Sequence, residues 1–209
     1  MHAPPEQPPS PSITFRRLDA DWLAGRPYQS HFCEENAWWL AADAALVALK
    51  RTVVVITNPG RSVAMWQQRA AVKDPIVWDY HVVIVVEAVD EQGSIAGPMV
   101  LDHDCRAGTV LPVDEWLMAS FPIEVAPQYA PRFRLIAGSD YIAGFASDRR
   151  HMRDDKGAPL QPFPSWPAIG EGKPNTLDSV LDLDDHGFGD VVDLDGFAEH
   201  FGLAPEEQQ

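Results

Sequence analysis

The sequence predicts an α+β fold, and three observations lead to that class. Short β-branched runs and alanine- or leucine-rich segments both occur along the chain, so strands and helices are both expected. They do not alternate as regular strand–helix–strand units, as a doubly wound parallel sheet would require. The hydrophobic share of 45% is that of an ordinary globular protein, and 209 residues suit one domain. We therefore expect a single domain over residues 13–209, preceded by a disordered proline-rich tail at residues 1–12.

The strongest helix is expected at residues 36–50, which are rich in alanine and leucine and contain no glycine or proline. A β-branched strand follows at 52–57 and is closed by a turn at 58–60. Residues 63–69 slightly favour a strand. The longest strand is expected at 76–89, and a turn at 90–93 leads into a returning strand at 98–104.

The second half of the chain predicts shorter elements. These are a helix at 113–119, a strand at 132–137, a helix at 139–145, a proline-rich surface segment without regular structure at 159–174, and helices at 176–182 and near 195–201.

The charge and cysteine content narrow the classes of function. Acidic residues outnumber basic ones by 31 to 16, giving a net charge of −15, which disfavours nucleic acid and anionic membranes as partners. Two cysteines exclude a disulfide-rich scaffold. Residues 1–12 resemble no secretory signal, and no apolar run is long enough to span a membrane. We expect a cytoplasmic protein with reduced thiols, and nothing in the sequence demands a partner chain, so we expect a monomer.

Cys33 is the first candidate for chemistry because it lies directly before the strongest helix. The positive end of a helix dipole and its free N–H groups favour the thiolate, which is the nucleophilic form of cysteine. The same N–H groups can stabilise the oxyanion of an attacked carbonyl. The alternative is that Cys33 is simply a small buried side chain.

His81 is the second candidate because a local hairpin can give it a carboxylate partner. If the chain turns near residue 93, the numbers of opposing residues sum to roughly 185. His81 then faces Asp104, and Asp102 is its diagonal neighbour, although a slip of one residue would move the acids to the other face. A cysteine, a histidine and an aspartate in this order suggest nucleophilic acyl chemistry.

Several segments, taken in order, resemble the protein N-terminal glutamine amidohydrolase family. The proline-rich residues 161–169 are also similar to a segment of that family. The segments that carry the resemblance are YQSHFCEENAWWL at 28–40, VWDYHVV at 77–83, VLDHD at 100–104 followed by VLP at 110–112, RFRLI at 132–136 and FASDRRHM at 145–152.

The resemblance implies a single-domain α-β-α sandwich akin to papain-like and transglutaminase-like cysteine hydrolases. It implies a catalytic triad of Cys33, His81 and Asp102, with no cofactor and no metal. The implied reaction converts the side chain of an N-terminal glutamine of a protein or peptide into glutamate and releases ammonia. This chain has Asp102-His103-Asp104 where the family usually has Asp-Leu-Asp, which leaves both acids as candidates for orienting the histidine.

The residue that binds the substrate's α-amine is not identified by the sequence. An acid is the natural partner of an ammonium group, and Glu34, Glu35 and Asp79 are near enough along the chain to be candidates. Two other functions stay open: a deamidase or transglutaminase acting on internal glutamines, and an inactive binding module with the same fold.

Three further patterns favour less specific interpretations. Residues 182–193 partly fit a calcium-binding loop, but the twelfth position is aspartate rather than glutamate, so calcium is not expected. A zinc site from Asp102, His81, His103 and Cys105 lacks paired ligand spacing. Residues 147–149 (SDR) are expected to cap and pair around a tight turn rather than to take part in catalysis.

Overall fold

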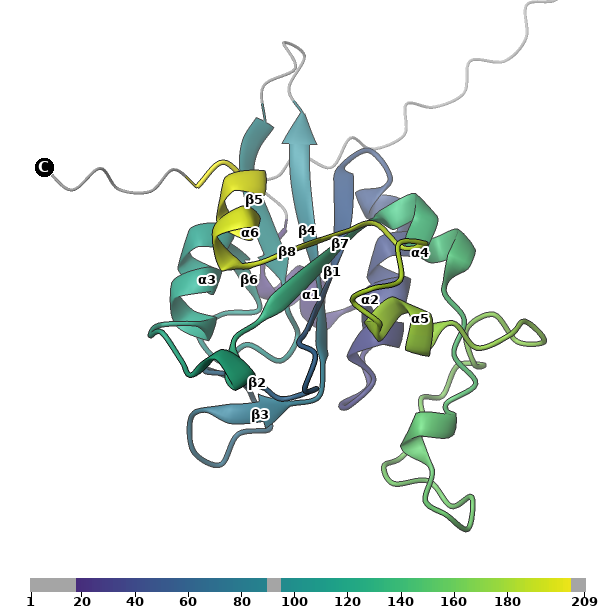
Figure 1. Ribbon diagram of the computed structural model, residues 1–209. Helices are drawn as coiled ribbons and strands as arrows, with labels where there is room; N and C mark the ends of the chain where they lie inside the picture. The colour runs from purple at the N-terminus through teal and green to yellow at the C-terminus, as the bar shows by residue number, and fades with distance from the viewer. Residues whose placement is uncertain (1–17, 90–94, 204–209) are drawn as a thin grey trace, which may run out of the picture.

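The fold is built on one antiparallel sheet of six strands. The computed structural model describes residues 18–89 and 95–203, so the predicted tail at 1–12 and the predicted turn at 90–93 lie outside the described residues. The strand order is β6-β5-β4-β1-β7-β8 (Figure 1). In that order the strands are Val110–Pro112, Ile95–Leu101, His81–Val89, Lys50–Thr57, Arg132–Ala137 and Asp190–Val192. Two short strands, β2 (Val63–Met65) and β3 (Ile76–Trp78), form a separate ribbon.

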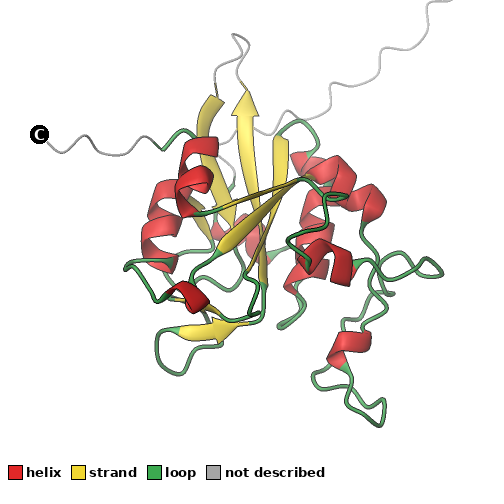
Figure 2. Cartoon of the chain, viewed as in Figure 1, coloured by secondary structure: helices red, strands yellow, loops and turns green. Residues whose placement is uncertain are grey.

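Helices cover both faces of this sheet (Figure 2). Alternate residues of β1 enter different cores, because neighbouring side chains of a strand point to opposite faces: Val53 and Val55 to one, Val54 and Ile56 to the other. The first core is closed by α1 (Ala20–Ala24), α2 (Cys33–Ala42), α4 (Gly138–Gly144) and α5 (Leu177–Leu181). The second is closed by α3 (Val113–Ser120) and α6 (Leu194–His200). The chain is therefore an α+β protein with three layers.

The hairpin that carries His81 has the predicted register. β4 and β5 pair Ile84 with Leu101 and Val85 with Val100, so opposing residue numbers sum to 185 as expected. A register shift between Val86 and Ala88 lies farther along the hairpin and does not alter this end. Because β5 ends at Leu101, the acids that follow it lie at the end of the sheet where β4 begins.

The predicted helix at 36–50 is wrong at both ends. α2 begins earlier, at Cys33, and ends at Ala42. Asp43 leaves the helical conformation, its side chain accepts the N–H of Ala45 at 2.7 Å, and a short 3-10 turn (Ala44–Leu46) follows. An aspartate that bonds to the backbone two residues ahead offers a local alternative to the helix, and this alternative overrides the alanine-rich composition.

The predicted strand at 76–89 is also interrupted. β3 ends at Trp78 and β4 begins at His81. Asp79 breaks the strand because its carboxylate accepts the N–H of Tyr80 and its carbonyl accepts the hydroxyl of Thr57. Because of this break, Asp79 and Tyr80 are not part of a continuous strand, and both line a cleft next to the start of α2.

The returning strand, predicted at 98–104, spans Ile95–Leu101 instead, and the strand favoured at 63–69 ends at Met65. The remaining elements follow the prediction closely. The strand at 132–137 has the predicted bounds, and the other helices of the second half differ by one or two residues. The proline-rich residues 159–174 contain no helix or strand. Within the described part of the chain, no helix has both the length and the apolar character needed to cross a membrane.

Candidate active site

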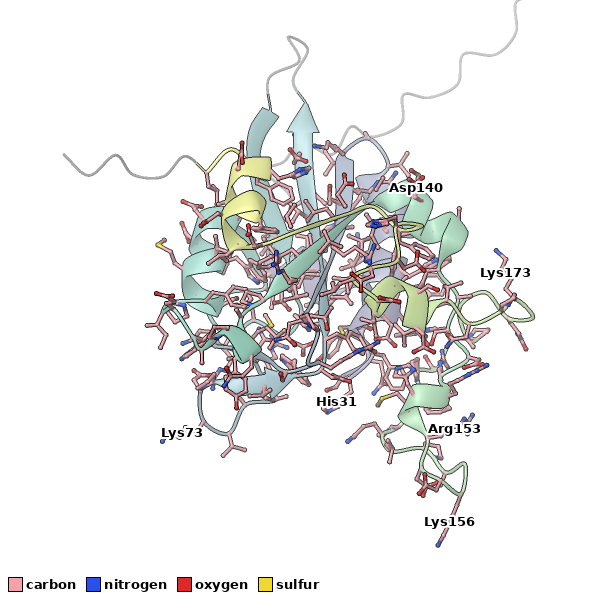
Figure 3. The ribbon with its side chains drawn as sticks, in the orientation of Figure 1. His31, Lys73, Asp140, Arg153, Lys156 and Lys173 are labelled. Atoms are coloured by element: carbon pink, nitrogen blue, oxygen red, sulfur yellow. The ribbon has the colours of Figure 1, made fainter. Side chains whose placement is uncertain are left out.

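The candidate site is a cleft at the end of the sheet where β4 begins. It has a volume of about 180 Å³ and is lined by both Cys33 and His81. Cys33 is the first residue of α2 and lies beside Val82 at the start of β4, whose backbone N–H lowers the pKa of the thiol. His31, two residues before Cys33, has a left-handed backbone with φ of 67° and lies at this end of the molecule (Figure 3). The structure thus brings the thiol of a helix terminus against the first residues of a strand.

His81 is paired with Asp102 rather than with Asp104. His81 Nε2 lies 3.1 Å from Asp102 Oδ1, and both side chains are buried. Two further donors hold this carboxylate: the indole N–H of Trp116 bonds Oδ2 at 3.1 Å, and the N–H of Asp104 bonds Oδ1 at 2.9 Å. Since Nε2 is engaged by Asp102, the other ring nitrogen of His81, Nδ1, is the one left for chemistry.

The second acid of this segment has a different partner. The hydroxyl of Tyr28 donates to Asp104 Oδ1 at 2.6 Å. Burial and the Asp104 carboxylate together raise the pKa of Tyr28, so this hydroxyl keeps its proton. Asp104 also lines the cleft.

The His81–Asp102 pair favours its charged form. Burial alone would lower the pKa of His81, but the charge and hydrogen bond of Asp102 outweigh it, and the pKa of His81 is raised above the usual 6.5. Burial likewise opposes ionisation of Asp102, but His81, Trp116 and the N–H of Asp104 lower its pKa. Each member of the pair thus favours the charged form of the other, which is the arrangement of an imidazole oriented by a carboxylate.

The thiol of Cys33 has the opposite tendency to the one expected from its place at a helix terminus. Burial and then the carboxylates of Glu34 and Asp104 raise its pKa well above the usual value, and the bond from Val82 N–H only partly offsets them. The direction of this pKa runs against the expectation that the helix end makes Cys33 a thiolate. Burial first, and then the nearby negative charges, outweigh the helix dipole, whose effect is typically below about 1 kcal/mol.

Comparison with known proteins agrees with these motifs. The sequence profile of a family described as N-terminal glutamine amidase matches residues 28–201. A curated relative from Danio rerio, named protein N-terminal glutamine amidohydrolase, is 34% identical over 84% of this chain and 89% of its own length. Relatives of the same name from Homo sapiens and Drosophila melanogaster are 33% and 30% identical, over 84% and 85% of this chain and 87% and 89% of their own.

The chain belongs to the N-terminal glutamine amidase family. It is thus a member of a family of enzymes that hydrolyse an amide bond. The matched range contains Cys33, His81 and Asp102.

Glu35, in the CEEN segment, forms a buried ion pair that connects α2 to a distant part of the chain. Its two oxygens accept two bonds of 2.7 Å from the guanidinium of Arg149, and the indole of Trp166 donates a third at 2.7 Å. Arg149 has a left-handed backbone, with φ of 60°, and also bonds the carbonyls of Trp166 and Pro167. The predicted structural role for residues 147–149 is confirmed, and Glu35 is removed from the candidates for binding an amine.

Sequence reasoning missed three side chains in or behind the cleft. Trp116 was not considered although it holds Asp102. Tyr80 and His151 line the cleft, and Tyr80 Oη lies 3.2 Å from His151 Nε2. The only sequence signal for His151 was its place in the FASDRRHM segment, while Trp116 lies in an ordinary amphipathic helix and gave none.

The segment at 182–193, which partly fits a calcium-binding loop, binds the side chain of Arg134. The guanidinium of Arg134 donates to the carbonyls of Asp182, Asp185 and Phe188, the latter two at 2.7 and 2.6 Å. Backbone carbonyls of this segment therefore accept hydrogen bonds from a positively charged side chain of the protein itself.

The candidate zinc ligands do not gather. His81 and Asp102 bond each other, whereas Cys105 is buried in the second core. Over residues 18–89 and 95–203, no three histidine, cysteine, aspartate or glutamate side chains are grouped so that they could hold a metal ion.

Proposed function

We propose that this protein hydrolyses the side-chain amide of an N-terminal glutamine through a Cys33–His81–Asp102 triad. The observation that carries the proposal is the shared cleft: Cys33 and His81 line it, and Asp102 is bonded to His81 from behind. A thiol, an imidazole and an orienting carboxylate are the parts of a nucleophilic acyl-transfer site. We further propose that the three-layer fold is of the papain-like or transglutaminase-like kind.

The reaction divides into two acyl-transfer steps. His81 Nδ1 takes the proton of Cys33, and the sulfur adds to the δ-carbon of glutamine, so that the carbonyl oxygen becomes negative. Backbone N–H groups at the start of α2 stabilise this oxyanion. The imidazolium then gives its proton to the departing nitrogen, the C–N bond breaks, and ammonia leaves a γ-glutamyl thioester on Cys33.

Hydrolysis of the thioester completes the cycle. Neutral His81 accepts a proton from water as the oxygen adds to the thioester carbon. The C–S bond breaks, the sulfur recovers its proton from His81, and an N-terminal glutamate is released. Asp102 stabilises the imidazolium in both steps, and the reaction requires no cofactor.

The charge of the cleft suits a substrate that carries a free amine. Asp79, Asp104 and Asp178 line it, and Arg61 is the arginine in its lining among the described residues. Proteins and peptides with N-terminal glutamine present an ammonium group about 5 Å from the δ-carbon. Of the acids named from the sequence, Asp79 is the one that lines the cleft, since Glu35 is bound to Arg149 and Glu34 is fully buried.

Matched peptides test the proposal directly. Ammonia release is measured for a Gln-Xaa peptide with a free amine and for the same peptide with an acetylated amine. The proposal expects turnover of the free peptide only. Equal turnover of both would indicate an enzyme for internal glutamines, and no turnover of either, from folded protein, would indicate a binding module.

A further inference from the structure

A second pair of acid and imidazole side chains lies beside the sulfur of Cys33. Glu34 follows Cys33 directly in α2, and its side chain is completely buried. The thiol donates to Glu34 Oε2 at 3.8 Å, and the other oxygen, Oε1, lies 3.3 Å from His151 Nε2. The chain of contacts therefore runs from the sulfur through Glu34 to a histidine at the cleft wall.

Glu34 and His151 are far apart in the sequence, so only the tertiary fold brings their side chains together. His151 follows the SDR turn, and the bidentate bond from Arg149 to Glu35 fixes that turn against α2. His151 is thereby held next to Glu34, with 23% of its side chain exposed. Glu34 Oε1 has no hydrogen bond of good geometry within the described residues, and the imidazole of His151 is the basic group that lies beside it.

We propose that Glu34 and His151 act as positioning residues for Cys33, with Glu34 holding the thiol hydrogen before substrate binds and His151 holding Glu34. The thiol then has two alternative partners, Glu34 in the resting enzyme and His81 in the attacking one. This inference rests on the proposed role of Cys33 as the nucleophile, and it concerns how that nucleophile is controlled.

Electrostatics give the proposed pair a second effect. A carboxylate within 4 Å of a buried sulfur opposes its ionisation. The charged and titratable groups around Cys33 are Glu34 from α2, Asp79, Tyr80 and His81 from the start of β4, Asp104 after β5, Tyr141 from α4 and His151 from the SDR turn. Among the acids, Glu34 has the largest effect on the pKa of Cys33, and it is the one that contacts the sulfur directly.

The test measures the reactivity of Cys33 without turnover. Iodoacetamide labelling of Cys33 is followed by mass spectrometry as a function of pH, which separates it from the buried Cys105. Glu34→Gln keeps the shape and an accepting oxygen but removes the charge. We expect its labelling midpoint to move to lower pH and labelling at pH 7 to become about tenfold faster. Glu115→Gln, an exposed change of equal charge on α3, is expected to leave the midpoint unchanged.

His151→Gln tests the outer member of the pair and does not rely on Glu34→Gln folding. The change removes the imidazole that lies beside Glu34 Oε1, so the buried carboxylate next to the sulfur loses its basic partner. We expect labelling several-fold slower than in the unchanged protein. In the double variant the histidine effect should vanish, because His151 acts through Glu34.

The outcomes separate this inference from the proposed function. An unchanged labelling midpoint in Glu34→Gln, or effects of the two changes that simply add, would overturn the inference while leaving Cys33 as the nucleophile. Ammonia release that survives Cys33→Ser would remove the proposed function itself.

Discussion

Two buried pairs of an acidic and a basic side chain lie near α2, and they differ in the basic group: an arginine in the Glu35–Arg149 pair and a histidine in the Asp102–His81 pair. Glu35 and Arg149 are joined by two bonds of 2.7 Å, and their side chains are 0% and 8% exposed. Asp102 and His81 are joined by one contact of 3.1 Å and are 2% and 3% exposed. Burial is thus nearly equal, while the number of bonds and the chemistry of the base are not.

The difference teaches which pair holds the structure and which can move a proton. A guanidinium stays charged at every ordinary pH, and its planar donors match the two oxygens of a carboxylate. The Arg149–Glu35 pair is therefore a structural ion pair that does not exchange protons. An imidazole gains and loses its proton near neutrality, so the His81 pair can take part in a reaction. His81 also lines the cleft, whereas Arg149 is not among the described residues that do so.

Removing the nucleophile should have the largest effect on turnover. Cys33→Ser replaces the thiol by a much less acidic hydroxyl and should lower ammonia release by about 1,000-fold or more. The free energy of unfolding should change little, since no ion pair is lost. Ammonia release from a Gln-Xaa peptide and urea unfolding measure the two quantities, and retained activity would exclude Cys33 as the nucleophile.

Removing the charge behind His81 should have the next largest effect. Asp102→Asn deprives the imidazolium of its stabilising carboxylate and should lower turnover by roughly 100-fold or more. Asp104→Asn is the matched change two residues away, and it should lower turnover less because Asp104 bonds Tyr28 instead. A larger loss from Asp104→Asn would mean that the pairing with Asp102 is not the catalytic one.

Breaking the Glu35–Arg149 ion pair should lower the free energy of unfolding more than the other substitutions described. Arg149→Met leaves the Glu35 carboxylate buried without its cation and should lower the free energy of unfolding by about 3–5 kcal/mol. Arg150→Gln is the neighbouring control, because Arg150 pairs with Asp148 on the surface and its loss should change stability little. Equal effects of the two changes in urea unfolding would contradict the structural role of Arg149.

The pH profile of turnover should reflect the titratable pair. The reactive state holds one proton between Cys33 and His81, and His81 must lose a proton to reach it from the imidazolium form. Because Asp102 raises the pKa of His81, kcat/KM should increase with pH through a value above 6.5. Asp102→Asn should move this limb to lower pH, and an acid limb below 6.5 in the unchanged enzyme would contradict the assignment.

Much of the fold follows from local sequence, and its failures have local causes. The β-branched runs predict the central strands, and the hairpin turn predicts the pairing sum of 185 that the structure has. The helix over 36–50 and the strand over 76–89 fail where an aspartate bonds to nearby backbone, at Asp43 and Asp79. Strand and helix propensities do not register such side-chain bonds.

The site divides in the same way. The hairpin register predicts that His81 lies near both acids, but it places Asp104 opposite and Asp102 diagonal, whereas the contact is with Asp102. The bond from Arg149 to Glu35 spans 114 positions and depends on the whole fold. The raised pKa of Cys33 is mostly a tertiary effect, since burial is its largest cause, although Glu34, next to it in the sequence, also contributes.

The smallest expected effect concerns the amine end of the substrate. Asp79 lines the cleft with an exposed side chain, so its attraction for an ammonium group is weakened by water. Asp79→Asn should raise KM for a free Gln-Xaa peptide by roughly fivefold with little change in kcat, because the lost attraction acts on binding more than on the reacting amide. Asp114→Asn, an exposed change of equal charge on α3, is the control and should leave KM unchanged. Unaltered KM in Asp79→Asn would move amine recognition to Asp104 or Asp178, the other acids of the cleft.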